Sequence, residues 1–273
     1  MPSPAFTVLI ATYAGDHPDH LDEALRSIFA NTVAPTEVLL VVDGPLPPAH
    51  LRVLDAYAQQ PTLRTLQQSS QSGLGPALNR GLREATTEWI VRADADDRNA
   101  PDRFAVLSAH LDGPLDLIGS AIREIDADGR VVGSRAPPLS ESQIWRFLPR
   151  RNPFNHMTVA YRRSLALACG GYPNVYLRED YALWARMMRA GARVRNLPDC
   201  LVTARAGAAL YARRGGWRYA VGEIALQRLL VAEGIKPVWL GLADGILRML
   251  VFLAPLALRR RVYEHWLRER AAA

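Results

Sequence analysis

Short apolar runs alternate with helical stretches through the first hundred residues of this 273-residue chain. We predict strands over 6–11, 37–42, 63–66 and 89–93, and helices over 20–30, 48–59 and 74–85. Short strands that alternate with helices are typical of βαβ units, whose strands lie parallel in one sheet. The pattern therefore predicts an α/β fold with a mainly parallel central sheet flanked by helices.

Polar side chains stand where three of these predicted strands end. They are Thr12, Asp43 and the run Asp94-Ala95-Asp96-Asp97. In open parallel sheets, ligands bind outside the carboxyl ends of the strands. We therefore expect a ligand site at this edge of the sheet.

The run Asp94-Ala95-Asp96-Asp97 is the strongest chemical signal in the chain. Carboxylates this close together repel one another unless a cation neutralises them. Mg²⁺ and Mn²⁺ prefer oxygen ligands and usually bind a carboxylate or two together with substrate phosphates. A solvated acidic loop is the alternative, whereas a calcium loop fits poorly because Asn99 and Ala100 stand where glycine would be needed.

The pattern changes after residue 97. Predicted strands over 117–125 and 131–134 flank the turn-like Asp126-Ala127-Asp128-Gly129, which indicates a β-hairpin. Further along, we predict helices over 141–148 and 181–190, with a strand over 157–161 between them. No internal repeat or low-complexity linker interrupts the sequence, so we expect one continuous α/β domain through about residue 200.

The last seventy or so residues differ from the rest. A helix is predicted over 217–233, and the 22 residues 237–258 contain only Asp244 and Arg248 as charges. A helix of that length could cross a bilayer, but two central charges would each cost roughly 2.5–3.5 kcal/mol. Arginines follow at 259–261. An amphipathic helix in the membrane interface and a helix packed on the catalytic domain both remain open.

The formal net charge of +6 favours anionic partners such as nucleotides, diphosphates and phospholipid headgroups. Nucleic acid is disfavoured because the arginines are scattered and no aromatic residues interleave with them. The two cysteines, Cys169 and Cys200, form no disulfide framework or zinc site. Because the N-terminus also lacks the pattern of a signal peptide, we expect a cytoplasmic protein.

Several segments, in this order and spacing, resemble the family 2 glycosyltransferases, and the resemblance extends from residue 6 to about 235. The segments are Val8-Leu9-Ile10-Ala11-Thr12-Tyr13, 37–44, Gly73-Leu74-Gly75, Asn79-Arg80-Gly81, the acid run at 94–97, Asn155-His156-Met157-Thr158 and Glu179-Asp180-Tyr181-Ala182-Leu183-Trp184. The chain is most similar to the bacterial branch that builds exopolysaccharides and lipopolysaccharide chains. This resemblance implies an inverting enzyme with the GT-A fold.

The resemblance also implies a domain organisation. Residues 1–205 would form the GT-A catalytic domain, with a nucleotide-binding half over 1–100 and an acceptor-binding half over 101–205. Residues 206–273 would form a basic, amphipathic helical region.

By the same resemblance, donor-binding roles fall on residues of the first half. Thr12 and Tyr13 would hold the nucleobase, and Asp43 the base or ribose, although a turn-forming Asp43-Gly44 is an alternative. The family often has a second acid and Gly-Ser here, whereas this chain has Val42 and Pro45. Gly75 would let the backbone approach the nucleotide, and Asn79 would also lie on the donor side. Asp94 would contact the ribose and the metal, and Asp96 would bind the metal. Asp97 is expected to support them.

The resemblance makes Asp180 the general base and places Glu179 beside it at the acceptor, although Asp180 also suits a helix N-cap. Asn155 and His156 would lie on the acceptor side, with a structural histidine as the alternative. Arg213 and Arg214 would reach the diphosphate from a loop, or else form a solvated basic turn.

Together these assignments predict an inverting transfer from a UDP-sugar to a saccharide acceptor, plausibly lipid-linked, with Mn²⁺ or Mg²⁺ bound. Peripheral contact with the inner face of the cell membrane is expected through the C-terminal region. A nucleotidyltransferase would share the sheet and the acid pair, but Ala11-Thr12-Tyr13-Ala14-Gly15-Asp16 lacks the basic, glycine-rich loop of that class. A non-catalytic nucleotide-binding protein is the other alternative.

Overall fold

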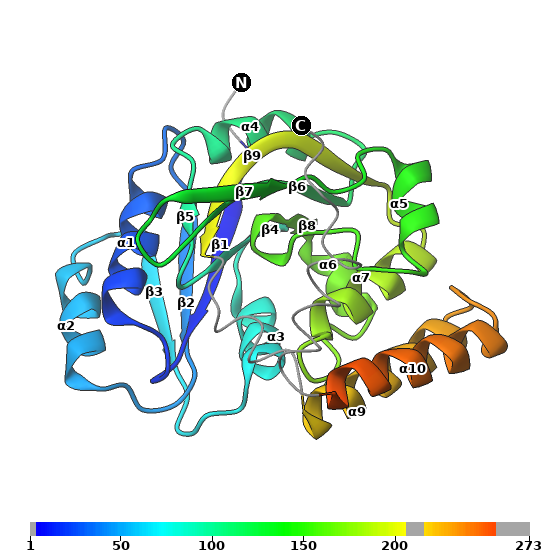
Figure 1. Ribbon diagram of the computed structural model, residues 1–273. Coiled ribbons are helices and arrows are strands. Elements are labelled where there is room, and N and C mark those ends of the chain that lie inside the picture. Colours follow the sequence, from blue (N-terminus) through cyan, green and yellow to red (C-terminus); the bar gives the residue numbers. More distant parts are fainter. Residues whose placement is uncertain (1–3, 206–215, 255–273) are drawn as a thin grey trace.

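A twisted nine-stranded sheet forms the centre of the computed structural model, which describes residues 4–205 and 216–254 (Figure 1). The strand order is β3-β2-β1-β4-β8-β6-β9-β5, and β7 pairs with β6 outside this path. The first four strands of that order are parallel, and the rest form a mixed sheet.

The parallel part follows the sequence prediction closely. Its strands are β1 (Phe6–Thr12), β2 (Glu37–Val42), β3 (Leu63–Gln67) and β4 (Trp89–Asp94). The helices α1 (Pro18–Phe29), α2 (Pro48–Ala56) and α3 (Leu74–Glu84) connect them. Every residue of β1 and β2 is buried, as expected for strands covered on both faces.

Alternate residues of β1 enter two separate cores. Phe6, Val8 and Ile10 pack with α1, whereas Leu9 packs with α3 on the opposite face. This alternation buries both faces of the strand, whose carboxyl end at Thr12 belongs to the edge where the ligand site is predicted.

The mixed part contains β8 (Ala160–Arg162), β6 (Leu117–Ile125), β9 (Val194–Arg205) and the short β5 (Arg98–Asn99). The predicted hairpin is confirmed, because β6 pairs antiparallel with β7 (Val131–Arg135). The predicted helices are present as α5 (Glu141–Phe147) and α7 (Glu179–Arg189). The sequence pattern did not predict β9, α4 (Arg103–Leu111) or α6 (Arg163–Ala168).

The strand predicted over 157–161 is wrong in its first half. His156–Thr158 forms a 3₁₀ helix, η1, and the strand β8 begins only at Ala160. The Thr158 hydroxyl donates to the carbonyl of Asn155 at 2.8 Å and accepts from the backbone N–H of Ser120 at 3.0 Å. The Thr158 side chain thus accepts a hydrogen bond from β6 that the backbone of a neighbouring strand would otherwise accept.

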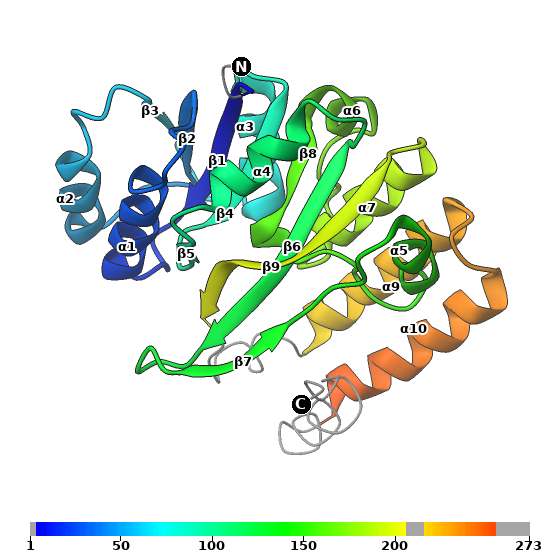
Figure 2. The ribbon, with the colours of Figure 1, turned by 90° about the horizontal axis from the view of Figure 1, so that it is seen from above.

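Two helices, α9 (Trp217–Ala232) and α10 (Val238–Leu253), follow β9 in the chain; α9 lies beside α7, and α10 packs on α9 (Figure 2). The second helix is shorter than the predicted 237–258 stretch, because Ala254 is already extended and Pro255 follows it. Among the described residues, no helix combines the length and apolar character needed to span a bilayer.

Candidate active site

The acid cluster, Asp94, Asp96 and Asp97, lies at the carboxyl end of β4. Each carboxylate offers one oxygen, and these oxygens all lie within 4.8 Å of one another. Two arginines contact the acid cluster. Arg92 forms an ion pair with Asp94 at 2.5 Å, and Arg205 donates from its backbone N–H to Asp97 at 3.1 Å and from Nε to the carbonyl of Asp96 at 3.0 Å.

Asp97 is buried, and its Oδ2 has no hydrogen-bond partner within the described part of the chain. Burial raises the pKa of Asp97 well above its usual value, and the charges of Asp94 and Asp96 add to this effect. An unpaired buried carboxylate oxygen among other carboxylates is costly without a cation. The donor set is all oxygen and therefore suits Mg²⁺ or Mn²⁺.

Arg92, the arginine that contacts Asp94, is almost fully buried, and no role was predicted for it from the sequence. Its Nη1 donates to the carbonyl of Leu9 at 3.3 Å, and its own carbonyl accepts Nη2 of the buried Arg103 at 2.8 Å. Burial, together with the charge of Arg92, lowers the pKa of Arg103 to about 9. The available signal was an arginine inside an otherwise apolar strand, since such a charge needs a partner.

The loop after β1 turns toward the same cluster. Asp16 accepts from the Thr12 hydroxyl at 3.0 Å and from the backbone N–H of Tyr13 at 3.1 Å. Burial raises the pKa of Asp16, and the charge of Asp94 adds to the effect. The structure thus adds Asp16 to the predicted pair Thr12 and Tyr13, as the residue that holds them in place.

Asp43 is buried at the end of β2, where the chain itself satisfies its carboxylate. It accepts the backbone N–H groups of Ser72 at 2.7 Å and Gly73 at 2.8 Å, and the Ser72 hydroxyl at 3.0 Å. Gly73, with φ +96°, precedes the first residue of α3. Asp43 therefore fixes the loop that starts α3, and its predicted contact with a base or ribose stays a prediction.

Helix α3 joins the two halves of the site. Asn79 donates to the carbonyl of Tyr172 at 2.7 Å and accepts its N–H at 2.8 Å, which ties α3 to the chain before α7. A Cβ on Gly75 would lie 3.6 Å from Cβ of Glu179. Glycine at this position thus lets the start of α3 lie close to the start of α7.

The acid pair, Glu179 and Asp180, occupies the first turn of α7. Asp180 is not the N-cap, because the helix begins at Glu179 after Arg178, whose side chain makes no capping bond. Asp180 instead accepts the side-chain amide of Asn152 at 2.6 Å, a partner that the sequence analysis did not assign. Burial raises the pKa of Glu179 to about 7, and the charge of Asp180 adds to the effect.

His156 is the first residue of η1, and Asn155 directly precedes it. The His156 ring lies against Tyr172 and Trp184, with Nε2 3.3 Å from the Tyr172 hydroxyl. Burial and the charge of Arg92 lower the pKa of His156, while both Asp180 and Asp94 act in the opposite direction. Asn155 is buried and donates to the carbonyl of Ser120 at 2.8 Å.

Residues from both halves of the chain therefore meet at one site. Arg92 affects the pKa of both Asp97 and Glu179, and both acid groups affect that of His156. Arg213 and Arg214, predicted to reach the diphosphate, lie outside the described residues.

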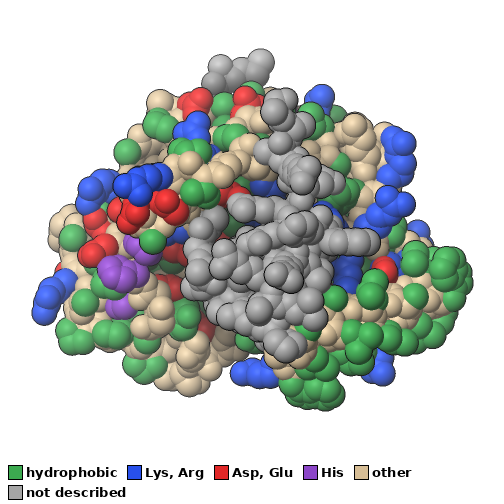
Figure 3. Space-filling view, viewed as in Figure 1, with side chains coloured by type: hydrophobic (Ala, Val, Ile, Leu, Met, Phe, Trp, Pro, Cys, Tyr) green, Lys and Arg blue, Asp and Glu red, His purple; other side chains and the backbone are tan. Residues whose placement is uncertain are grey.

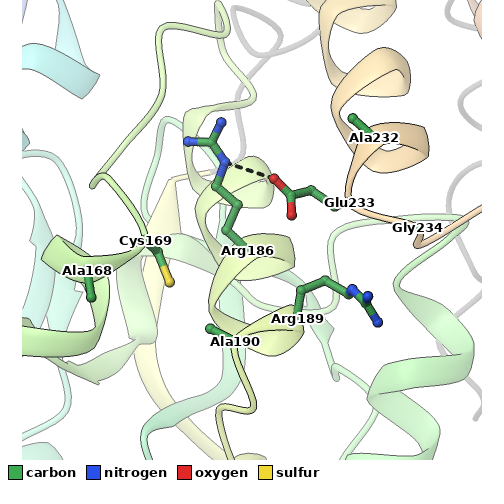
Figure 4. Close-up of a pocket in the computed structure, with 8 residues that line it drawn as sticks. All are labelled: Ala168, Cys169, Arg186, Arg189, Ala190, Ala232, Glu233 and Gly234. Atoms are coloured by element: carbon green, nitrogen blue, oxygen red, sulfur yellow. Dashed lines mark hydrogen bonds and ion pairs between the residues drawn. The ribbon is translucent and has the colours of Figure 1, made fainter.

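A surface pocket elsewhere contains none of the predicted residues (Figure 4). It lies at the C-terminal end of α7, near α6 and the end of α9, and its rim includes Cys169 and Arg189. Arg186 and Glu233 pair within it at 3.3 Å. The acid pair lies at the opposite end of α7, roughly 15 Å away along a helix of this length.

Sequence relatives cover almost the whole chain. An uncharacterized glycosyltransferase of Haemophilus influenzae is 36% identical, over 97% of this chain and 99% of its own. The UDP-Gal:alpha-D-GlcNAc-diphosphoundecaprenol beta-1,3-galactosyltransferase of Escherichia coli is 33% identical, over 97% and 98%.

Solved structures share the fold at lower identity. TarS 1–349 of S. aureus, in complex with UDP-GlcNAc, matches with a TM-score of 0.68 at 18% identity, over 97% of this chain and 76% of its own. The mannosyltransferase PcManGT of Pyrobaculum calidifontis, in complex with GDP-Man and Mn²⁺, matches with a TM-score of 0.61 at 19% identity, over 98% and 89%. The expected GT-A fold is confirmed by these matches.

The model of glycosyl transferase family 2 matches residues 7–170, the region that contains the parallel sheet, the acid cluster and η1. Together with relatives that are more than 30% identical along nearly the whole chain, this match confirms the resemblance seen in the sequence. The chain belongs to glycosyl transferase family 2 and is a glycosyltransferase.

Proposed function

We propose that this glycosyltransferase moves a sugar from a UDP-sugar onto a lipid-linked saccharide during synthesis of a cell-surface polysaccharide. The E. coli relative supports both substrate classes, because its name specifies UDP-Gal as donor and a diphosphoundecaprenol-linked sugar as acceptor. TarS, whose structure contains UDP-GlcNAc, supports the uridine nucleotide.

The acid cluster carries this proposal. Asp94 and Asp96 would hold a divalent cation, Mn²⁺ or Mg²⁺, and the unpaired Oδ2 of Asp97 supports a cation at this position. The Mn²⁺ in the PcManGT complex is consistent with such a metal. When bound, the cation would offset the negative charge of the donor diphosphate.

The nucleotide-binding half would extend over residues 1–100. Thr12, Tyr13 and Asp43 would lie toward the nucleoside, since Thr12 ends β1 and the other two directly follow strands that end at this edge of the sheet. Gly75, in the first turn of α3, and Asn79, near its middle, would lie on the side of the donor that faces the acid pair.

The acceptor-binding half would extend over residues 101–205 and include the acid pair. Asp180 would take the proton of the acceptor hydroxyl as its oxygen bonds to the anomeric carbon and the bond from that carbon to the diphosphate breaks. Asn152 supports this role because its amide fixes one carboxylate oxygen of Asp180. A single displacement of this kind inverts the configuration of the sugar carbon.

His156 and Asn155 would lie beside the acceptor, and Glu179 would lie next to the base. The lowered pKa of His156 favours an uncharged imidazole at neutral pH, and the pKa of Glu179, raised to about 7, favours a protonated carboxyl group below neutral pH. Uncharged groups suit the hydroxyl groups of a saccharide, because they offer hydrogen bonds without adding charge beside Asp180.

We place the reaction on the cytoplasmic face of the cell membrane, where residues 206–273 would contact the lipid. Support for this location comes from the lipid-linked acceptor in the name of the E. coli relative. Arg213 and Arg214 would approach the diphosphate from this region.

A donor screen tests the proposal. With Mn²⁺ present, UDP-sugars should raise the melting temperature of the protein more than GDP-, ADP- or CDP-sugars do, because only a ligand that binds the folded state stabilises it. Transfer should then release UDP. Stabilisation only by another nucleotide sugar, or release of pyrophosphate, would refute the proposed donor.

A further inference from the structure

The apolar side of helix α10 faces away from the rest of the protein. Its most exposed residues are Val238, Trp239, Leu242, Ile246, Leu247 and Leu250, each at least 54% exposed. They lie on one side of the helix, and hydrophobic side chains gather over α10 in the space-filling view (Figure 3). A helix that packs on a water-soluble protein normally has the opposite orientation.

The side of α10 that faces α9 contains glycines. Gly241 and Gly245 are buried there, and a Cβ on Gly241 would lie only 2.5 Å from Cγ2 of Val231. Small residues let two helices approach closely without using large apolar side chains. Most large apolar side chains of α10 therefore point away from α9 and are exposed on the surface of the protein.

Polar groups fill the space between α9 and α10. Lys236 pairs with Asp244 at 2.7 Å and donates to Gln227 at 2.8 Å. Glu223 is fully buried and pairs with Arg178 at 2.9 Å and Arg248 at 3.2 Å. Buried charges are tolerated when they are paired in this way. The polar groups between α9 and α10 therefore have their partners inside the protein, and the apolar side of α10 takes no part in these contacts.

The same network connects the helix pair to the catalytic end of α7. Arg178, which pairs with Glu223, directly precedes Glu179, and its guanidinium lies 4.7 Å from the ring of Tyr219 on α9. Tyr176 and Leu177, in the same loop, are 43% and 40% exposed. The outward side of α10 and the acid pair therefore belong to one connected part of the molecule.

We propose that the outward side of α10 docks on a bilayer surface that contains anionic lipids. This deepens the proposed function, since it assigns the membrane contact to a particular helix face. Seven apolar side chains supply the contact: Val238, Trp239, Leu242, Ile246, Leu247, Leu250 and Leu253. Apart from the indole N–H of Trp239, they have no hydrogen-bonding groups, whereas a protein interface of useful size contains several hydrogen bonds.

Charge on the helix pair favours an anionic surface. The acids of residues 216–254 are Glu223, Glu233 and Asp244, and each is ion-paired with a basic side chain. Arg218 and Arg228 are exposed on α9, and the sequence continues after α10 with arginines at 259–261. An apolar helix face together with exposed cations on the same pair of helices is typical of segments that lie in the interface of an anionic membrane.

Flotation with vesicles of phosphatidylethanolamine and phosphatidylglycerol tests the proposal on the full chain. The wild-type protein should float with the vesicles. The variant L242Q/I246Q/L250Q should reduce the vesicle-bound to free ratio by roughly tenfold or more, since each change removes apolar surface from the contact. The control L51Q/V131Q/V132Q removes exposed apolar side chains from α2 and β7 and should bind as the wild type does.

Two further measurements keep the test decisive. Transfer to a water-soluble acceptor should be equal in the wild type and the α10 variant, so a failure of docking is distinguishable from a failure of the proposed reaction. Light scattering of the wild type should give the mass of one chain. A wild type that does not float, equal flotation of the α10 variant, or a dimer that this variant dissociates would each overturn the proposal.

Discussion

Two groups of neighbouring acids in this glycosyltransferase are held in opposite ways. The acid cluster at the end of β4 contacts Arg92 and Arg205, and still leaves a buried oxygen of Asp97 without a hydrogen-bond partner among the described residues. The acid pair at the start of α7 has the amide of Asn152 and a buried Glu179 whose pKa is about 7. The first arrangement suits a cation, and the second suits the exchange of a proton. Neighbouring carboxylates in a sequence therefore indicate metal binding or proton transfer only once the groups that contact them are known.

The largest effect is expected from the proposed base. D180N should lower kcat by roughly 10²–10⁴-fold, because an amide cannot accept the acceptor proton. Binding of UDP and Mn²⁺ should persist, since the acid cluster is intact. Isothermal titration and a UDP-release assay measure the two quantities. The control is D199N at an exposed position of β9, and unaltered turnover in D180N would remove Asp180 from the role of base.

D96N tests the other group. We expect kcat to fall by roughly 10²–10³-fold, because the site loses a carboxylate that offsets the charge of the cation. In contrast with D180N, binding of Mn²⁺ should weaken as well, and Mn²⁺ electron paramagnetic resonance can follow this directly. D128N, in the exposed turn before β7, is the matched control. Equal Mn²⁺ binding by D96N and the wild type would contradict the assignment.

Glu179 should make stability depend on pH. Its pKa is raised from 4.5 to about 7, so the folded state keeps a proton that the unfolded chain loses over this window. The free energy of unfolding should therefore fall as pH rises from about 4.5 to 7, by up to about 3 kcal/mol, and then level off.

Urea unfolding at pH 5 and pH 8 measures this difference. E179Q should lose that part of the pH dependence and be the more stable protein at pH 8. E141Q, at an exposed position of α5, should follow the wild-type curve. A wild type that becomes more stable between these pH values, with E179Q unchanged from it, would show that Glu179 is not held protonated.

The smallest effect is expected from Asn152, the hydrogen-bond partner of the proposed base. N152A removes one hydrogen bond to Asp180, so kcat should fall about tenfold while KM for the donor changes little. N174A, at an exposed position before α7, is the control. A purely structural role for Asn152 would instead lower the melting temperature and leave kcat per folded molecule constant.

Much of the fold of the first hundred residues could be predicted from the sequence. The β2 bounds match the prediction, and β1, β3 and β4 differ from it by one residue at their ends. Strands buried on both faces of a parallel sheet have continuous apolar sequences, so they can be predicted from neighbouring residues alone. The acid cluster was equally visible, because its members are neighbours in sequence.

The second half was harder to predict. Strand β9 contains Pro198, and its pairing with β6 shifts register near Ala121. The 3₁₀ turn η1 depends on Thr158 bonding to Ser120, 38 positions away. Neither feature produces a periodic pattern, since both depend on residues that come together only when the chain folds.

The sequence by itself determined the succession of strands and helices along the first hundred residues, the family, and the acids at the carboxyl edge of the parallel strands. Only the tertiary structure decided which groups those acids meet. Asn152 reaches Asp180 across 28 positions, and Arg205 reaches Asp97 across 108. It also decided that α10 turns its glycines inward and its leucines outward. Periodicity identifies an apolar side of a helix, but only the neighbouring elements determine what that side faces.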